Sequence, residues 1–162
     1  MKKFELTTES ITNEAGKKLF RIKALIDFGD VKAGELGGYV EKEGNVSQDD
    51  NAWVSGDAEV FGNAKVFGNA RVSGHAWVSD NAWVSDNADY ALVQGFGIKF
   101  RCTTFYRGKN KKIMVNCGCF HGDLEEFRKQ VKETRSGKIA KEYLMIADLM
   151  EYHFVSEDSS DE

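Results

Sequence analysis

The 162-residue sequence predicts a mainly β protein with α-helices near its C-terminal end, built around a short parallel β-helix. Three observations support this fold class. A six-residue repeat occupies the middle of the chain, alternating apolar and polar residues flank it, and two helix-like apolar stripes follow. A chain of this length can form one core with small appended units. We expect a cap over 1–35, the repeat over 36–95, a C-terminal module over 96–155 and an acidic tail over 156–162.

The repeat has a strict period of six. Alanine stands at positions 52, 58, 64, 70, 76, 82 and 88, and valine at positions 54, 60, 66, 72, 78 and 84. Residues two apart in a strand point to the same face, and turn residues such as Ser55-Gly56-Asp57 follow each pair. A helix would repeat at three and four residues, and a hairpin would need a longer excursion. The spacing therefore predicts a short strand and a corner in every hexad, with alanine and valine facing inward.

The hexads, among them Val60-Phe61-Gly62-Asn63-Ala64-Lys65, resemble the hexapeptide repeat of left-handed β-helices. The resemblance implies three hexads in each triangular coil of 18 residues, and a left-handed path. About three coils fit into residues 36–89. Lys42 and Gln48 interrupt the inward pattern of the first coil.

Stacking at an 18-residue offset places equivalent residues in columns about 4.8 Å apart. Three corner columns follow: Asn45, Asn63 and Asn81; Asn51, Asn69 and Asn87; and Tyr39, Asp57 and His75. Asparagine tolerates the left-handed backbone, so we expect the asparagines to turn the chain. His75 has two interpretations, a corner residue or a group for acid/base or ligand chemistry.

Large aromatic side chains flank the inward valines and should point outward. The predicted partner-binding or ligand-binding residues are Trp53, Phe61, Phe67, Arg71, Trp77 and Trp83. Phe61 and Trp77 should share one face, Phe67 and Trp83 the next, and Trp53 and Arg71 the third, as a candidate cation–π site. The four aromatic residues of the first two faces amount to roughly 600 to 1,000 Å², more than an ordinary surface patch. The chain's own ends, a second copy or a foreign partner could each cover them.

The flanking segments carry hairpin and helix signals. Strand-like residues 4–7 and 19–24 surround a turn at 13–16 and predict a hairpin that caps the repeat. Residues 98–106 and 112–120 predict a second hairpin around a turn at 107–110. Asp123 and Glu126 form a helix-start pattern, and a second helix should follow Gly137. The fold is thus a β-helix with an N-terminal hairpin cap, a C-terminal hairpin and two helices.

Composition excludes several classes of protein. Lys and Arg number 22 against 26 Asp and Glu, and the net charge of -4 argues against sequence-specific nucleic-acid binding. No apolar run is long enough for a membrane span, and no hydrophobic signal segment follows the first residues. Three cysteines are too few and odd in number for a disulfide framework. We expect reduced thiols and a cytoplasmic location.

Nearly the whole chain resembles a group of small bacteriophage- and prophage-encoded proteins. The likeness lies in Arg21-Ile22-Lys23-Ala24-Leu25, Leu36-Gly37-Gly38-Tyr39-Val40, the hexads and the segment from Cys117 to Phe127. It implies an architecture, a viral origin and the cytoplasm of a bacterial host, but no shared reaction.

Two kinds of chemistry have weaker support. Cys117, Cys119 and His121 alternate along a predicted strand and could ligate zinc, although their spacing is unusual for such a site. Hexapeptide-repeat proteins also include acetyl-CoA-dependent acyltransferases, for which His75 would be the general base. About three coils without an inserted loop would give acyl-CoA only a short surface to bind, so we expect no cofactor.

We therefore expect a non-enzymatic binding or assembly protein that forms a homo-oligomer. Its partner would be a bacterial host protein, such as one of host defence, or a small nucleotide. Acidic residues could imitate the phosphates of nucleic acid. Alternatively, a phosphorylated ligand could be held by Arg71, Arg101, Arg107, Lys109, Lys111 and Lys112.

Overall fold

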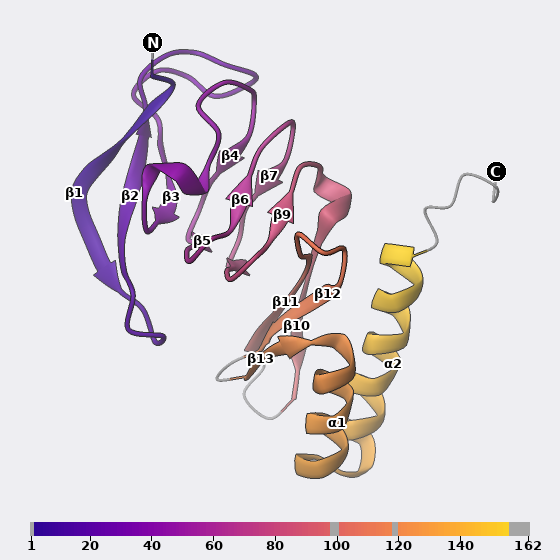
Figure 1. The fold of residues 1–162 in the computed structure, drawn as a ribbon. Helices are drawn as coiled ribbons and strands as arrows, with labels where there is room; N and C mark the ends of the chain where they lie inside the picture. The colour runs from indigo at the N-terminus through magenta and orange to yellow at the C-terminus, as the bar shows by residue number, and fades with distance from the viewer. Residues whose placement is uncertain (1, 98–100, 118–119, 156–162) are drawn as a thin grey trace.

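The computed structural model describes residues 2–97, 101–117 and 120–155 (Figure 1). The strands are β1 (Phe4–Thr12), β2 (Lys18–Ala24), β3 (Leu36–Val40), β4 (Trp53–Val54), β5 (Glu59–Val60), β6 (Lys65–Val66), β7 (Arg71–Val72), β8 (Trp77–Val78), β9 (Trp83–Val84), β10 (Tyr90–Phe96), β11 (Arg101–Arg107), β12 (Ile113–Cys117) and β13 (Phe120–Asp123). Short 3-10 turns lie at Glu43–Asn45 and Asn87–Asp89, and the helices are α1 (Leu124–Thr134) and α2 (Gly137–Val155). The N-terminal strands and the helices lie at opposite ends of the molecule.

The prediction of a parallel left-handed β-helix as the fold class is wrong. The strands form separate, short sheets in the orders β1-β2-β3-β5-β8, β10-β11-β12-β13, β4-β7 and β6-β9. Pairing is mostly antiparallel, and each parallel pair joins only two residues of each strand. A corner follows every two-residue strand, so no long parallel ladder forms. The protein is a mixed β fold with two C-terminal helices.

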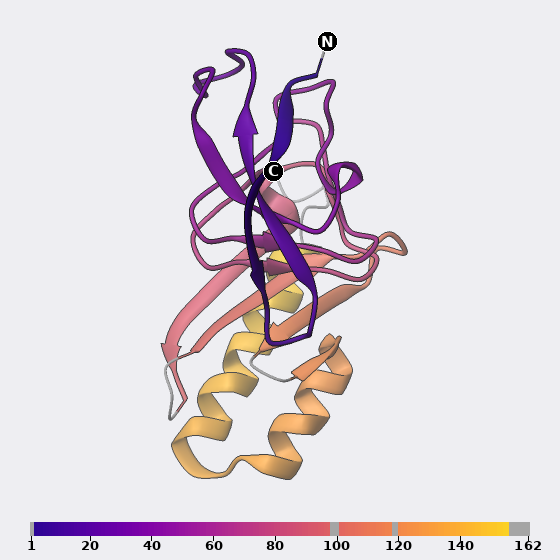
Figure 2. The same cartoon turned by 90° about the vertical axis from the view of Figure 1, so that its left-hand side faces the viewer.

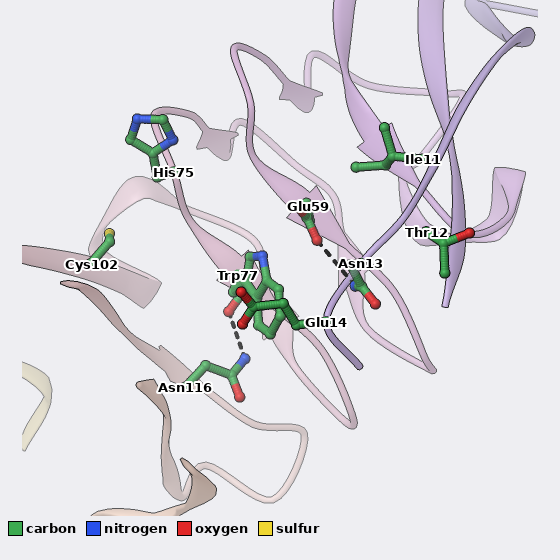
Figure 3. A pocket seen from close by; sticks show the side chains of 9 residues that line it. All are labelled: Ile11, Thr12, Asn13, Glu14, Glu59, His75, Trp77, Cys102 and Asn116. Carbon is green, nitrogen blue, oxygen red and sulfur yellow. Dashed lines mark hydrogen bonds between the residues drawn. The ribbon is translucent and has the colours of Figure 1, made fainter. Parts of the chain in front are cut away.

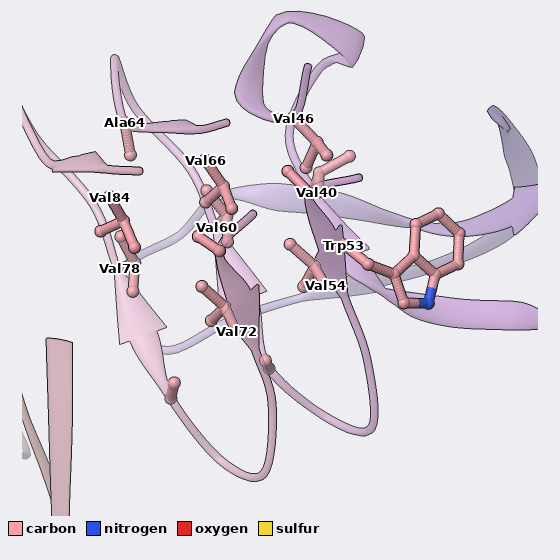
Figure 4. Packing of buried hydrophobic residues seen from close by; sticks show 14 of the residues in the cluster. Val40, Val46, Trp53, Val54, Val60, Ala64, Val66, Val72, Val78 and Val84 are labelled. Carbon is pink, nitrogen blue, oxygen red and sulfur yellow. The ribbon is translucent and has the colours of Figure 1, made fainter. Parts of the chain in front are cut away.

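The repeat segment, residues 52–84, nevertheless buries its small apolar side chains in one shared interior (Figure 4). Every alanine and valine at the six-residue positions of this segment is at most 1% exposed. Residues 18 apart are parallel partners, as in Val54 with Val72, Val60 with Val78 and Val66 with Val84. The six-residue spacing therefore does predict which side chains face inward.

Glycine and not asparagine adopts the left-handed backbone at the corners. Positive φ angles occur at Gly56, Gly62, Gly68 and Gly74, each of which directly precedes a predicted corner residue. The prediction that the asparagines and His75 adopt the left-handed backbone is therefore wrong. Glycine takes these positions, because a residue without Cβ adopts this backbone at lower cost. At the next corner the left-handed residue is Asp80, with a φ of 60°.

The N-terminal hairpin extends a sheet of the repeat. β1 and β2 pair around a turn at 13–17, and β2 is antiparallel to β3, which in turn lies parallel to β5. Phe4 and Phe28 pack edge-to-face on Trp53, at centroid distances of 6.1 and 5.3 Å. The buried Lys3 Nζ donates to main-chain carbonyl oxygens of Asp50 and Ala52. The predicted hairpin thus covers one face of the repeat and one edge of its sheet.

The C-terminal module is a four-stranded antiparallel sheet covered by two helices. β11 and β12 are the expected second hairpin, while β10 and β13 were not predicted as strands. Asp123 caps α1, and its side chain and that of Glu126 each accept the other's backbone N–H, as the sequence predicts. The predicted positions 98–100 and the acidic tail, 156–162, lie outside the described residues.

Side-chain contacts attach this module to the repeat. Thr104 Oγ1 accepts the Trp77 backbone N–H at 2.9 Å, and Asn116 Nδ2 donates to the Trp77 carbonyl at 2.7 Å. The Lys109 backbone N–H donates to the Asn81 carbonyl at 2.7 Å. Figure 2 shows the β1–β2 hairpin reaching along the repeat toward this end of the molecule. Neither helix in the described part of the chain has the length and apolar content needed to cross a membrane.

The corner geometry gives a test with two matched glycines. Gly68 and Gly16 have φ angles of +65° and +80°, but a Cβ at Gly68 would lie 2.6 Å from the Ser85 carbonyl oxygen, whereas at Gly16 it would meet nothing within 4 Å. Gly16→Ala should lower the free energy of unfolding by about 1 kcal/mol. Gly68→Ala should lower it by roughly 1 to 3 kcal/mol more, because a backbone atom blocks the new methyl group. Urea denaturation measures both, and equal losses would contradict this account of the corner.

Candidate functional site

A cleft opens where the hairpin turn, the repeat segment and the C-terminal sheet meet (Figure 3). Two adjoining cavities of about 440 and 450 Å³ form it, and Glu14, Trp77 and Asn116 line both. The first cavity also contacts Glu59 and His75, and the second contacts residues that include Phe61, Asp80 and His121. We call these joined cavities the Trp77 cleft.

Trp77 stands at the centre of the cleft and is held from several sides. Its backbone is fixed by Thr104 and Asn116 of the C-terminal sheet. Its ring packs edge-to-face on Phe61 at a centroid distance of 5.6 Å, and Phe61 in turn packs with Leu19 and Tyr39. Because its backbone and ring are both packed, the indole presents a largely preformed surface to the cleft.

Glu59 supplies a half-buried carboxylate beside this ring. Burial is the main reason that the pKa of the Glu59 carboxyl is raised above its ordinary value. Hydrogen bonds from Asn13 Nδ2, at 3.1 Å, and from the Trp77 side chain oppose the shift, whereas the neighbouring carboxylates of Glu14 and Asp57 add to it. The carboxylate is therefore poorly solvated and lacks a cationic partner among the described residues.

A hydrogen-bonded chain of three side chains lines the other end of the cleft. Asn116 Nδ2 donates to the Trp77 carbonyl and to Ser79 Oγ, so Asn116 Oδ1 is the acceptor that faces His121 Nδ1 at 2.5 Å. His121 Nδ1 therefore carries a proton. The other ring nitrogen, Nε2, lies 3.4 Å from Asp80 Oδ2. The Asp80 carboxylate is thereby linked to the C-terminal sheet.

Asp80 lines the cleft with its backbone in the unfavourable left-handed conformation. Four preceding corners use glycine at the equivalent left-handed position, and Asp80 carries a side chain there. Aspartate is better tolerated in this region than most residues, but it still costs more than glycine. Backbone strain that is retained at a cleft suggests a functional side chain.

The cleft has an acidic electrostatic character. Glu14, Glu59 and Asp80 come from three different segments, and Lys17 is the single lysine or arginine among the lining residues. The two histidines stand at its edges, and both side chains are exposed. The cleft therefore favours a cation with an apolar or planar body over an anion.

The structure places the predicted aromatic residues in the expected pairs but exposes them unequally. Phe67 and Trp83 pack edge-to-face at 5.7 Å, and Trp83 is 42% exposed. Trp53 and Arg71 are register partners on β4 and β7. Trp53 is only 1% exposed beneath the N-terminal segments, and Arg71 pairs with Asp30 at 2.6 Å. A ligand could reach the Trp53 ring only if those segments moved away.

The alternative residues for chemistry are not assembled into a reactive group. His75 lines the first cavity, and its ring has no hydrogen-bond or ion-pair partner within residues 2–97, 101–117 and 120–155. A general base is normally oriented by such a partner. Of the proposed zinc ligands, Cys119 lies outside the described residues, Cys117 Sγ accepts from Thr103 Oγ1, and His121 contacts Asn116 and Asp80. In the described chain no three potential metal ligands cluster.

Sequence reasoning missed Glu59, Asp80 and Asn116 as site residues. Asp80 carried a detectable signal, since each of the three preceding hexads has a glycine at the equivalent position, at Gly62, Gly68 and Gly74. Glu59 directly precedes an inward valine and lies on the same face as Trp77, which follows 18 residues later. Asn116 had no such signal, because its position depends on how the C-terminal sheet docks.

No protein-family model and no curated protein matches the chain. The resemblance to phage-encoded proteins therefore stays a prediction.

The raised pKa of Glu59 predicts a pH dependence of stability. Protonated Glu59 favours the folded state fully below the ordinary glutamate pKa of about 4.3, and this contribution is lost as the pH rises through the higher folded-state pKa. Relative to the wild type, Glu59→Gln should therefore gain free energy of unfolding between about pH 4 and pH 7. Urea denaturation across this range measures the difference, with the exposed Glu5→Gln as control. A difference that stays constant with pH would contradict the burial of this carboxylate.

Proposed function

We propose that this protein is a non-enzymatic binding protein whose Trp77 cleft takes a basic side chain of a partner protein, in the cytoplasm of a bacterial host. The observation that carries the proposal is that the carboxylates of Glu14, Glu59 and Asp80 line the two adjoining cavities that share Trp77. A host defence protein, as expected from the phage resemblance, is the kind of partner we have in view.

An arginine or lysine side chain matches the cleft in charge and in shape. A cation beside Glu59 would restore the electrostatic stabilisation that burial removes from this carboxylate. Charge-assisted hydrogen bonds to carboxylates are about twice as strong as neutral ones. A guanidinium group can also stack on an indole face, and the long apolar stem of either residue suits the ring of Phe120.

The two ends of the cleft suggest how a peptide would lie. Glu59 lines the first cavity and Asp80 the second, while Glu14 and Trp77 line both. A segment with two basic residues could therefore place one in each cavity. Glu14 lies on the exposed hairpin turn and, among the described residues, forms no ion pair that would compete with the incoming chain.

The acidic lining disfavours a nucleotide in this cleft, since its phosphates would meet three carboxylates and one ammonium group. The acyltransferase alternative has less support. It would require His75 as base, and the ring of His75 lacks an orienting partner in the described structure.

The proposal is tested with short blocked peptides as probes. A Gly-Arg-Gly peptide should shift the Trp77 indole N–H resonance saturably, whereas a Gly-Gln-Gly peptide should not. One charge-assisted contact and one cation–π contact together predict a Kd on the order of 1 mM. Glu59→Gln should weaken binding by about tenfold, which corresponds to ~1.4 kcal/mol. NMR titration measures these effects residue by residue.

The controls separate the cleft from the remaining surface. Glu5→Gln removes an exposed carboxylate outside the cleft and should leave the peptide affinity unchanged. Equal shifts with both peptides, or an affinity that Glu59→Gln does not change, would refute the cleft as a basic-group site. A Trp77 response to adenosine monophosphate or acetyl-CoA in place of the arginine peptide would favour the nucleotide or acyltransferase alternative.

We also propose that the protein self-associates, through an exposed face of α2. Met145, Leu149 and Tyr152 lie on its outer face and are 61%, 57% and 70% exposed. Asp148 and Glu151 of this helix are already paired with Arg128 of α1, at 2.9 and 2.6 Å, so the interface would rest on the apolar residues. Two antiparallel α2 helices, each about 28 Å long, would bury these residues against one another.

Light scattering tests this pairing. The wild type should have about twice the mass of the 18.1 kDa chain, and Leu149→Asp should return it to the mass of one chain. Trp83→Glu should leave the mass of the dimer unchanged. Dissociation by Trp83→Glu alone would assign the interface to the repeat face instead, and a monomeric wild type would refute self-association.

A further inference from the structure

A second groove, around the corner from the Trp77 cleft on the neighbouring face, has the opposite electrostatic character. It has a volume of about 310 Å³, and lysine side chains of three different segments line it. These are Lys42 before the first 3-10 turn, Lys65 on β6 and Lys109 in the turn between β11 and β12. We call it the Trp83 groove, after the exposed tryptophan in its wall.

Within the described part of the chain, no carboxylate forms an ion pair with the three ammonium groups of this groove. No carboxylate is among the residues that line the groove. The ion pairs found among residues 2–97, 101–117 and 120–155 do not involve Lys42, Lys65 or Lys109. Three like charges around one hollow repel one another, so an anion there would be stabilised by all three.

Trp83 provides a flat aromatic surface among these charges. Lys65 is its register partner on the neighbouring strand, and Lys109 Nζ lies 5.5 Å from its ring centroid. Phe67 packs against the ring edge-to-face, at 5.7 Å, and so fixes its orientation. With 42% of the residue exposed, the indole offers a surface on which a planar group can stack.

The polar groups of the groove add hydrogen-bonding capacity. Asn63 and Asn81 are corner residues one 18-residue step apart, and both are exposed. Lys42 Nζ donates to Asn63 Oδ1 at 3.4 Å, and the Lys109 backbone is held by the Asn81 carbonyl. Two lysines are thus positioned by contacts with the asparagine corners.

We infer that the Trp83 groove binds a mononucleotide, with the base stacked on Trp83 and the phosphates held by Lys42, Lys65 and Lys109. Stacking of a base on an aromatic side chain is favourable and depends little on the identity of the base. The volume of about 310 Å³ lies at the lower end of the range for small-ligand sites. A long nucleic acid is disfavoured, because it would extend over a protein of net charge -4.

This site is independent of the Trp77 cleft in composition and in charge. The residues that line the two sites do not overlap, and one is acidic while the other is basic. The inference therefore goes beyond the proposed function and does not depend on it.

The experiment uses adenosine triphosphate, adenosine and inorganic triphosphate as three probes of the full chain. Isothermal titration calorimetry should show the tightest binding for the nucleotide and at least tenfold weaker binding for each of the other two. Lys65→Gln and Trp83→Leu should each weaken nucleotide binding by about five- to tenfold, and Lys65→Gln should also reduce the salt dependence. Trp83→Leu keeps an apolar contact for Phe67, and circular dichroism confirms that each variant is folded.

A matched control locates the site. Lys23→Gln removes an exposed lysine of β2 and should leave nucleotide affinity unchanged. Inorganic triphosphate that binds as tightly as the nucleotide would overturn the role of Trp83 in stacking. Absence of nucleotide binding, or affinity unaffected by both Lys65→Gln and Trp83→Leu, would overturn the site itself.

Discussion

The narrow interior of the repeat segment is the constraint on which the remaining structure depends. Only alanine and valine fill its six-residue positions, and they are almost completely buried. Such small side chains hold residues 18 apart in parallel register, and this register fixes which outward residues become neighbours. The aromatic pairs of both candidate sites follow from it, because Phe61 and Trp77, and likewise Phe67 and Trp83, are each brought together across neighbouring strands.

The sequence predicts local features better than their assembly. The buried alanines and valines, the first hairpin and the Asp123 helix cap follow from periodicity and capping chemistry. The fold class does not, since a hexad pattern gives inward positions but not the length of each strand. Two-residue strands between glycine corners leave short separate sheets, whereas the longer flanking strands pair antiparallel. β10 and β13 were missed because they have weak alternation and depend on pairing with β11 and β12.

For the candidate sites, too, local features could be predicted from the sequence but their assembly could not. The outward-facing aromatic side chains of the repeat could be predicted as binding residues from sequence, and Trp77 and Trp83 do line cavities. Their charged surroundings could not be predicted in this way. Glu14 reaches the Trp77 cleft from the hairpin turn and Lys109 reaches the Trp83 groove from a distant turn, so each depends on the docking of a flanking module. The two aromatic pairs therefore lie in opposite electrostatic environments on neighbouring faces of the repeat.

The number of hexads also acts as a spacer between the two flanking modules. The hairpin joins the repeat through β3, and the C-terminal sheet joins it at β8 and β9. Each additional set of 18 residues would separate these attachment points by one strand spacing, about 4.8 Å. A chain with one more such set would have a wider Trp77 cleft, still bounded by Glu14 of the hairpin turn and by Asn116 of the C-terminal sheet. Duplication of a segment could in this way enlarge the partner that is accepted, while the residues at the two ends of the cleft stay the same.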